Sequence, residues 1–159
     1  MRRRRGRERP DRSDFTAQPD ALRFIIAVKD AGVRVAAASF SKNANLFLRQ
    51  IRLDSFAEQE GISSTTLRPG MTLLGYFDAD VSGMDFAHGK PDLEMFLTAA
   101  NELGVPAERA IVMEDASAGV QAAKAGEMGA IGIGRKNDAE LLAIATATAQ
   151  RARRPTSEL

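Results

Sequence analysis

The chain has 159 residues, 44% of them hydrophobic, which is enough for one domain with a substantial core. It contains no cysteine and one histidine, His88. This composition excludes disulfides, thiolate zinc sites and histidine-cluster metal sites, and it argues against a Ser-His-Asp triad. No apolar stretch is long enough to cross a membrane, and the arginines at the start are not followed by the apolar region of a signal peptide. We therefore expect a cytoplasmic protein without a membrane partner.

The formal net charge of +1 hides two basic ends and an acidic body. Residues 1–12 carry +5 and residues 151–159 carry +2, so residues 13–150 carry −6. An arginine-rich arm suits a nucleic acid or an anionic surface, but no aromatic residue alternates with these arginines for base stacking. We therefore favour an unstructured tail and expect no nucleic-acid binding. The expected organisation is an Arg-rich tail at 1–14, a core domain at 15–148 and a basic tail at 149–159.

The first part of the body alternates helix, strand and helix patterns. The stretch "PDALRFIIAVKDAG" predicts a helix capped by Asp20 and ended by Gly32. The small and β-branched residues of "VRVAAAS", residues 33–39, predict a buried strand. The stretch "NANLFLRQIRL", residues 43–53, predicts a helix. The apolar face expected for this second helix consists of Ala44, Phe47, Leu48 and Ile51.

The second part of the body repeats this alternation after residues 54–75, which contain the loop signal "SSTTLRPG" and receive no firm assignment. "PDLEMFLTAANELG" predicts a helix that begins at Pro91 and ends at Gly104. "AIVM" and "GAIGIG" predict strands at 110–113 and 129–134. The remaining expected features are an apolar stripe of Leu93, Phe96, Leu97 and Ala100, a helix from Ser117 to Ala125, and a last helix over 138–150 capped by Asp138.

Alternation of apolar strands with helices is typical of an α/β fold, a three-layer Rossmann-like parallel sheet with helices on both faces. Ligands of such sheets bind at the carboxyl ends of the strands. Ser39 follows one predicted strand, and Glu114 and Asp115 follow another. These three side chains are therefore candidates for a binding site.

The stretch "SFSKN" between a predicted strand and helix has two interpretations. Its hydroxyls, its lysine and its exposed backbone amides would form an anion site. Serine and asparagine also cap helices without any ligand, and the motif alone favours this second interpretation. The residues concerned are Ser39, Phe40, Ser41, Lys42 and Asn43.

The stretches "HGKPD" and "MEDASAG" supply charged candidates. Lys90 precedes the proline that opens a predicted helix, so its ammonium group is a candidate to lie near the strand ends, whereas His88 receives no role. A site of Glu114 and Asp115, with oxygen ligands only, suits Mg²⁺, which retains water and takes one or two carboxylates. The alternative is that these acids interact favourably with the N-terminus of the next helix.

Taken together, these motifs resemble the haloacid dehalogenase (HAD) superfamily, in its β-phosphoglucomutase-like phosphatase and mutase branch, from about Pro19 to Leu142. The resemblance implies that Ser39 contacts the transferring phosphoryl group within an "S-x-S-K-N" motif that here reads "SFSKN". It implies that Lys90, in "GKPD", neutralises the phosphate, although the usual spacing before Asp92 is shortened. It also implies that Glu114 and Asp115, in "EDASAG", bind Mg²⁺.

The resemblance also implies a first motif, D-x-D, on a central strand upstream of Ser39, whose first aspartate attacks phosphorus. The acids upstream of Ser39 form no D-x-D, and none follows an apolar strand. A D-x-D at Asp78 and Asp80 comes after the serine motif, and we interpret it as structural. The chain is thus expected to be truncated relative to the family, with an incomplete sheet whose central first strand and whose cap domain are missing. Unpaired backbone groups would then flank the gap.

The leading hypothesis is a HAD-like hydrolase core for Mg²⁺-dependent phosphoryl transfer on a small phosphorylated metabolite such as a sugar phosphate, with little or no turnover by this chain alone. The alternative is a non-catalytic phosphate- or metal-binding remnant, or a module completed by another chain that supplies the missing strand. A phosphoacceptor receiver domain also uses acids, a hydroxyl and a lysine. Its acidic pair comes first in the chain, whereas here it comes last, and we set this class aside.

Overall fold

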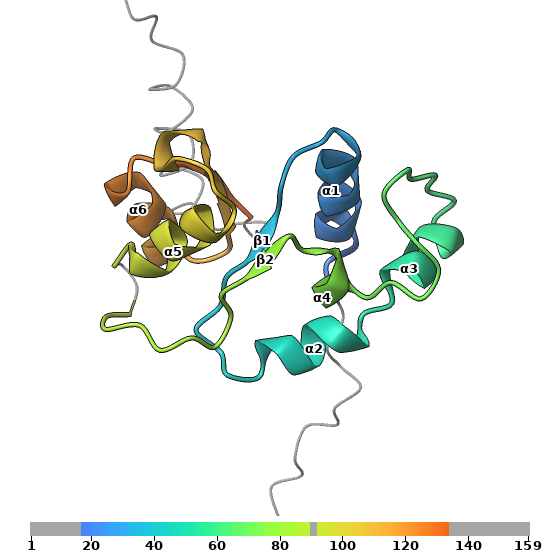
Figure 1. The fold of residues 1–159 in the computed structure, drawn as a ribbon, viewed down its shortest axis with the longest axis horizontal. Helices are drawn as coiled ribbons and strands as arrows, with labels where there is room; N and C mark the ends of the chain where they lie inside the picture. The colour runs from blue at the N-terminus through green and yellow to red at the C-terminus, as the bar shows by residue number, and fades with distance from the viewer. Residues whose placement is uncertain (1–16, 90–91, 134–159) are drawn as a thin grey trace, which may run out of the picture.

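The computed structural model describes residues 17–89 and 92–133 (Figure 1). In chain order the helices are α1 (Pro19–Asp30), α2 (Ala44–Gln50), α3 (Leu53–Gln59), α4 (Leu73–Tyr76), α5 (Glu94–Glu102), the 3-10 turn η1 (Ala107–Arg109) and α6 (Ser117–Ala125). The strands are β1 (Ala36–Ala37), β2 (Ala79–Asp80), β3 (Ile111–Glu114) and β4 (Gly129–Gly132). No helix in these ranges is both long and apolar enough to span a membrane.

The four strands form two separate two-stranded parallel sheets, β1–β2 and β3–β4. In the first, Ala36 lies opposite Ala79; in the second, Ile111 lies opposite Gly129, and the register continues to the pair of Glu114 and Gly132. The sequence predicted β1, β3 and β4 as parallel strands, whereas no strand was predicted at β2. It did not predict that they would form two sheets in place of one continuous sheet, but it did predict a gap.

In each sheet one strand, β1 or β3, has an outer edge that faces away from the strand it pairs with. The carbonyls of Val35, Ala37 and Ser39 accept hydrogen bonds from the β2 side. Because alternate residues of a strand direct their backbone groups to opposite edges, those of Ala36 and Ala38 face the other way. No described strand pairs with that edge of β1, and the same is true of the edge of β3 away from β4. The split therefore agrees with the expected gap.

Two hydrophobic cores hold the described residues together, and we name them by their elements. The sheet core joins α5 and α6 to both sheets and consists of Val81, Met95, Phe96, Ala99, Ala100, Ala122, Ala123 and Met128. The helix core joins α1, α3 and α4 and consists of Leu22, Ile26, Leu53, Ala57, Leu73 and Tyr76. Figure 1 shows β1 and β2 between these two groups of helices, with α5 and α6 on one side and α1 on the other.

Helix α1 has the predicted extent but a different cap. Pro19 occupies its first turn and Gln18 is the N-cap, so Asp20 lies inside the first turn, where its charge suits the helix dipole. The prediction of an Asp20 cap was wrong. Gly32, at φ +80°, adopts the left-handed conformation just after the helix, as its predicted end requires. Leu22 and Ile26, one turn apart, are buried in the helix core.

The helix expected over 43–53 ends at Gln50, because the chain becomes extended at Ile51 and Arg52 forms an antiparallel bridge with Thr72. A second helix, α3, follows at once. The predicted apolar face is half-buried, and Leu48 and Ile51 pack against the helix core. The stretch 54–75, which received no assignment, holds most of α3, a loop and the start of the single turn α4.

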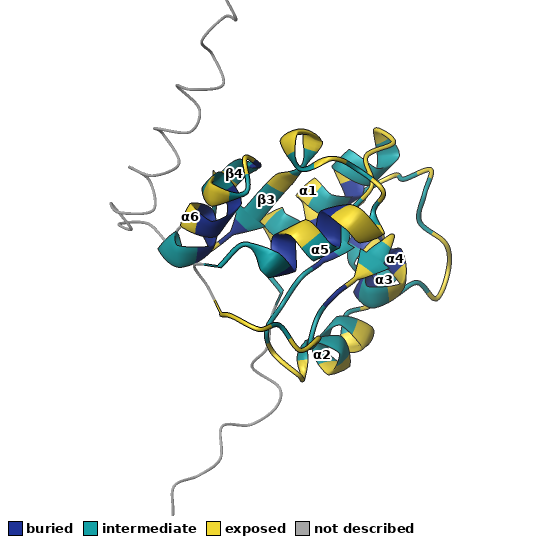
Figure 2. Cartoon of the chain, turned by 60° about the vertical axis from the view of Figure 1, so that its left-hand side comes forward, coloured by how far each residue is buried: buried dark blue, intermediate teal, exposed yellow. Residues whose placement is uncertain are grey.

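Helix α5 is shorter than predicted and buries a different stripe. It buries Met95, Phe96, Ala99 and Ala100, whereas Leu97 is 39% exposed. Figure 2 shows both buried and exposed positions on α5. Leu97 was therefore wrongly placed in the core, because α6 and Met128 join the sheet core on the Met95 side of the helix. The segment from β3 to β4 follows the prediction more closely. Helix α6 has the predicted bounds, and its fully buried Ala122 and Ala123 permit close packing. The helix expected over 138–150 lies outside the described residues.

Candidate functional site

Ser39 lies two residues beyond β1, at the carboxyl end of that strand, where the sequence placed it. Its side-chain Oγ accepts a hydrogen bond from the Ser41 amide at 3.2 Å, and its carbonyl accepts one from the Gly83 amide at 2.8 Å. The first bond fixes the hydroxyl oxygen and leaves its hydrogen able to donate to an anion. Ser41 repeats the pattern, since its Oγ accepts from the Asn43 amide at 3.3 Å.

Lys42 contacts the loop that follows β2. Its ammonium group donates to the Gly83 carbonyl at 2.8 Å and forms an ion pair with Asp85. The Lys42 hydrogen bond is the largest cause that lowers the pKa of Asp85 below its ordinary value. Two of the three donor positions of an ammonium group are thereby used, and one remains for a ligand. The sequence motif predicted Lys42 as an anion donor but not Asp85 as its partner.

Phe40 and Asn43 contribute to the loop in different ways. The Phe40 ring meets Phe86 edge to face, with ring centroids 5.6 Å apart, and packs against the sheet core. Phe40 therefore anchors the loop through its side chain. Asn43 is the N-cap of α2 but makes no side-chain capping bond, so the capping interpretation of "SFSKN" finds no support at this residue.

The acidic pair at the end of β3 is asymmetric. Glu114 is buried, with 9% exposure, and its Oε1 accepts a hydrogen bond from the Ala116 amide at 3.1 Å, just before α6 begins. Asp115 is exposed. The two acids thus face different surroundings, one against the first turn of a helix and the other towards solvent. The sequence treated them as equivalent ligands and missed this difference.

The two candidate groups belong to different sheets. The serine loop, residues 39–43, follows β1. The acidic pair closes β3, with Glu114 as its last residue and Asp115 directly after it, so both groups lie at carboxyl ends of parallel strands, as expected from the sequence. Within the described ranges, no group of three or more Asp, Glu, His or Cys side chains is arranged to hold a metal ion. Lys90, the third candidate, lies outside the described residues. Its flanks are held together, because the Asp92 amide donates to the Gly89 carbonyl at 3.1 Å.

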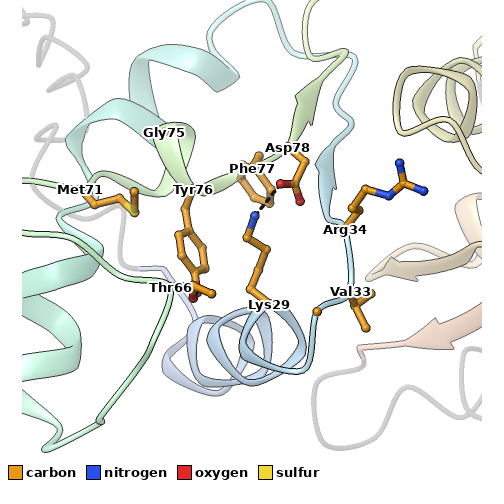
Figure 3. Close-up of a pocket in the computed structure, with 10 residues that line it drawn as sticks. Lys29, Val33, Arg34, Thr66, Met71, Gly75, Tyr76, Phe77 and Asp78 are labelled. Carbon is orange, nitrogen blue, oxygen red and sulfur yellow. Dashed lines mark hydrogen bonds and ion pairs between the residues drawn. The ribbon is translucent and has the colours of Figure 1, made fainter.

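The D-x-D pair at Asp78 and Asp80 is structural at Asp78, in agreement with the interpretation from sequence. Asp78 accepts a hydrogen bond from the Lys29 ammonium group at 2.6 Å (Figure 3). It also accepts one from the Val35 amide at 2.7 Å. It therefore joins α1, the start of β1 and the start of β2. Asp80 is exposed and accepts from the Ser82 amide at 2.8 Å.

The pKa of Asp78 reflects this position. Burial raises the pKa, but the hydrogen bonds from Lys29 and Val35 and the nearby positive charges outweigh it. The pKa consequently lies below its ordinary value of 3.8, and the carboxylate is ionised at neutral pH. The Lys29 ammonium group also lies 5.2 Å from the centre of the Tyr76 ring, which adds a cation–π contact.

A cavity of about 270 Å³ lies at this junction. Figure 3 shows the residues that line it, among them Lys29, Tyr76 and Asp78. The cavity lies near the starts of β1 and β2, whereas Ser39 follows the end of β1. Two of the charged residues in its lining, Lys29 and Asp78, are already paired with each other. We therefore do not assign the candidate phosphate site to this cavity.

The comparisons with known proteins agree with the motif analysis. The sequence profile of the haloacid dehalogenase-like hydrolases matches residues 4–126. The β-phosphoglucomutase of Bacillus subtilis is 31% identical over 117 residues, which are 74% of this chain and 43% of that protein. SUPPRESSOR OF QUENCHING 1, a chloroplastic protein of Arabidopsis thaliana, is 37% identical over 115 residues, which are 72% of this chain and 9% of that protein.

Solved structures show the same relationship. The β-phosphoglucomutase of Clostridium difficile superposes with a TM-score of 0.50 and 28% identity, covering 75% of this chain and 44% of that one. A putative β-phosphoglucomutase from Thermotoga maritima gives a TM-score of 0.51 and 27% identity, covering 79% of this chain and 50% of that one. The chain thus spans half or less of the length of these relatives.

The parallel strands, the serine loop and acidic pair at their carboxyl ends, and the matches over these residues together define the family of this chain. The chain belongs to the haloacid dehalogenase-like hydrolases, in their β-phosphoglucomutase-like branch, and has their Rossmann-like α/β fold.

Proposed function

We propose that this chain is the phosphate- and Mg²⁺-binding part of a phosphoryl-transfer enzyme that acts on small phosphorylated sugars. One observation carries the proposal: the Ser39 loop and the Glu114–Asp115 pair both end parallel strands, in a chain of the phosphatase and phosphoglucomutase family. The substrate class is supported by relatives named β-phosphoglucomutase, from Bacillus subtilis, and fructose-1-phosphate phosphatase, from Escherichia coli.

The donor set of the acidic pair fits Mg²⁺. Both side chains offer carboxylate oxygens, and Mg²⁺ is commonly held by one or two carboxylates while it keeps several water molecules. Asp115, which is exposed, would bind the ion directly, and Glu114, which is held by the Ala116 amide, would form the wall of the site. When bound, the ion would neutralise the negative charge of the phosphoryl oxygens.

The remaining candidates would hold the phosphoryl group. The Ser39 hydroxyl, whose oxygen already accepts from the Ser41 amide, would donate its hydrogen to a phosphoryl oxygen. The third donor position of Lys42, the ammonium group of Lys90 and the backbone amide at Phe40 would bind the others, whereas the Asn43 amide is already bonded to Ser41 Oγ. All of these groups stabilise charge, and none is a nucleophile that attacks phosphorus.

The attacking carboxylate would come from a segment other than these 159 residues. No D-x-D precedes Ser39 in the sequence, and Asp78 is engaged with Lys29 and Val35. We therefore expect the chain to bind Mg²⁺ and phosphate but to have little or no turnover by itself.

Two measurements on the full chain test this function. Mg²⁺ should raise the unfolding temperature of the wild type and of Glu108→Gln, a matched control at an exposed acid, but not that of Asp115→Asn. Hydrolysis of p-nitrophenyl phosphate should stay at background with or without Mg²⁺. Mg²⁺-dependent hydrolysis that Asp115→Asn abolishes would contradict the expected lack of turnover, and an equal Mg²⁺ response in all three proteins would contradict the metal site.

A second candidate function is a module completed by an added strand, and the division into two sheets favours it. The edges of β1 and β3 carry backbone groups that the described strands do not pair. An extended segment bound along such an edge would satisfy these groups by β-augmentation. A segment that ends in carboxylates would in addition bring the missing nucleophile to the carboxyl ends of the strands.

The experiment for this second function uses a synthetic peptide with an apolar strand of about five residues that ends in Asp-x-Asp. Binding should slow amide hydrogen exchange at Ala36 in β1, at Ala38 just after β1, and at Ile111 and Met113 in β3. The control peptide has proline at the centre of the strand, because proline lacks the amide donor. Equal protection by both peptides, or by neither, would contradict strand addition.

A further inference from the structure

Gly119 in the first turn of α6 lies directly against the Glu114 side chain. A Cβ atom at this position would come closer than 3.0 Å to Cγ, Cδ and Oε2 of Glu114, a separation that real Cβ atoms essentially never show. At Gly129 a Cβ would meet Ile111 Cγ1 at 3.1 Å, a tight contact with the end of a flexible side chain. The contact at Gly119 is of a different kind, because the group in the way is a buried carboxylate.

The position of the Glu114 carboxylate is thus defined from two sides of the same helical turn. Its Oε1 accepts from the Ala116 amide at 3.1 Å, and its Oε2 lies where a side chain at 119 would begin. Glu114 is the one buried charged residue among the described residues. A buried carboxylate must keep its hydrogen bonds, since an unpaired charge in this environment is costly. Displacement of the Glu114 carboxylate by a methyl group at position 119 would therefore strongly destabilise the protein.

Glycine at 119 has no conformational explanation. It lies within the helix, where glycine is less favourable than alanine because more backbone entropy is lost on folding. Its φ is not in the left-handed region, unlike that of Gly32 or Gly104. The contact with Glu114 is the feature of the structure that excludes alanine.

We propose that Gly119 is a positioning residue that sets where the Glu114 carboxylate lies beside Asp115, and thereby shapes the cation site. The metal part of this proposal rests on the function proposed above. Substitution by alanine forces the carboxylate away from the Ala116 amide and moves one wall of the site, while Asp115 keeps its place at the end of β3.

A double-mutant cycle of unfolding temperatures on the full chain tests the contact itself. Gly119→Ala should lower the unfolding temperature, whereas in the Glu114→Ala background the same change should raise it or leave it unaltered, because the obstructing side chain is gone. Gly126→Ala is the matched control at the end of α6, where a Cβ meets ordinary contacts at 3.6 Å and φ is −87°. Its effect should be equal in both backgrounds.

The proposal stays testable if Gly119→Ala alone fails to fold, because the double variant Glu114→Ala/Gly119→Ala should then fold. A loss of equal size in both backgrounds would overturn the proposal. It would show that a Cβ at 119 collides with something other than Glu114.

Mg²⁺ binding, measured by calorimetry well below the unfolding temperature, separates a positioning role from a merely structural one. The dissociation constant should rise at least tenfold in Gly119→Ala and stay unchanged in Gly126→Ala. Equal affinities of Gly119→Ala and wild type would overturn the positioning role. A wild type that binds no Mg²⁺ would overturn the proposed function instead, while the thermal cycle would still decide whether Gly119 positions Glu114.

Discussion

The two small sheets are held together by different forces. In β1–β2 the register covers two residue pairs, and side-chain charges secure the strands, with Asp78 bound to Lys29 and to the Val35 amide. In β3–β4 the register covers four pairs, and α6 covers the sheet with fully buried alanines. The serine loop therefore depends on ion pairs as well as on the packing of Phe40, whereas the acidic pair depends on close packing.

The two parts of the candidate site should therefore respond differently to pH and to mutation. A sheet secured by charges should be sensitive to pH and to loss of a charge. A sheet secured by packing should be sensitive to side-chain volume, because protein interiors are close-packed. Variants in the two regions should separate these responses.

The largest expected effect is on packing, at Met95 in the sheet core. Met95 is 1% exposed, so Met95→Ala should lower the free energy of unfolding by about 2–5 kcal/mol in urea denaturation. Leu97→Ala, on the same helix, should cost about 1 kcal/mol or less because Leu97 is 39% exposed. A larger loss for Leu97→Ala than for Met95→Ala would instead support the apolar stripe predicted from the sequence, which contains Leu97.

The second largest effect is expected from the removal of a charge in the β1–β2 sheet. Asp78→Asn should lower the free energy of unfolding by about 1–2 kcal/mol, because a hydrogen bond to a charged group is lost at a site that is partly open to water. Asp80→Asn is the control within the same D-x-D pair and should change the free energy of unfolding by about 0.5 kcal/mol or less. Equal effects at the two aspartates would contradict the structural role of Asp78.

The contrast between the regions also explains which features the sequence could predict. The segment from β3 to β4 was predicted well because its apolar run, its helix and its glycine-rich strand are local patterns. The candidate residues of the serine loop could be selected from the sequence because their motif, residues 39–43, is contiguous. The bounds of α6 and the positions of Ser39, Glu114 and Asp115 at strand ends followed from the same patterns.

What the sequence could not predict depends on residues distant in the chain. The partners of Asp78 and Lys42 lie more than forty positions away, at Lys29 and Asp85. The face of α5 that is buried depends on where α6 lies, which no local period encodes. The role of Gly119 had a visible clue in "EDASAG", since a glycine inside a helix is unfavourable without a packing reason.

A pH effect on the α1 side is expected to be smaller. The Asp30 Oδ1 accepts hydrogen bonds from Ser64, Thr65 and Thr66, and the Thr66 hydroxyl is the largest cause that lowers the pKa of Asp30 below 3.8. The unfolded chain thus takes up a proton more readily than the folded one, so this contribution is present above pH 3.8 and is lost as the pH falls through the folded-state pKa.

Unfolding temperatures of the wild type and Asp30→Asn across this range measure the contribution. The difference between the two proteins should be largest at neutral pH and should close below pH 3.8. A difference that is constant with pH would mean that the bonds to the 64–66 loop do not depend on the charge of Asp30.

The smallest expected effect on stability is at Lys42, and it connects the comparison to the proposed function. The side chains of the Lys42–Asp85 pair are 61% and 95% exposed, so Lys42→Met should change the free energy of unfolding by about 0.5 kcal/mol or less. Inorganic phosphate should nevertheless stabilise this variant less than it stabilises the wild type, because one anion donor is lost. Lys124→Met, on α6, should respond to phosphate as the wild type does. A large loss of stability without any change in the phosphate response would make Lys42 a structural tie between the loops after β1 and β2, and the anion site would then rest on Ser39 and Lys90.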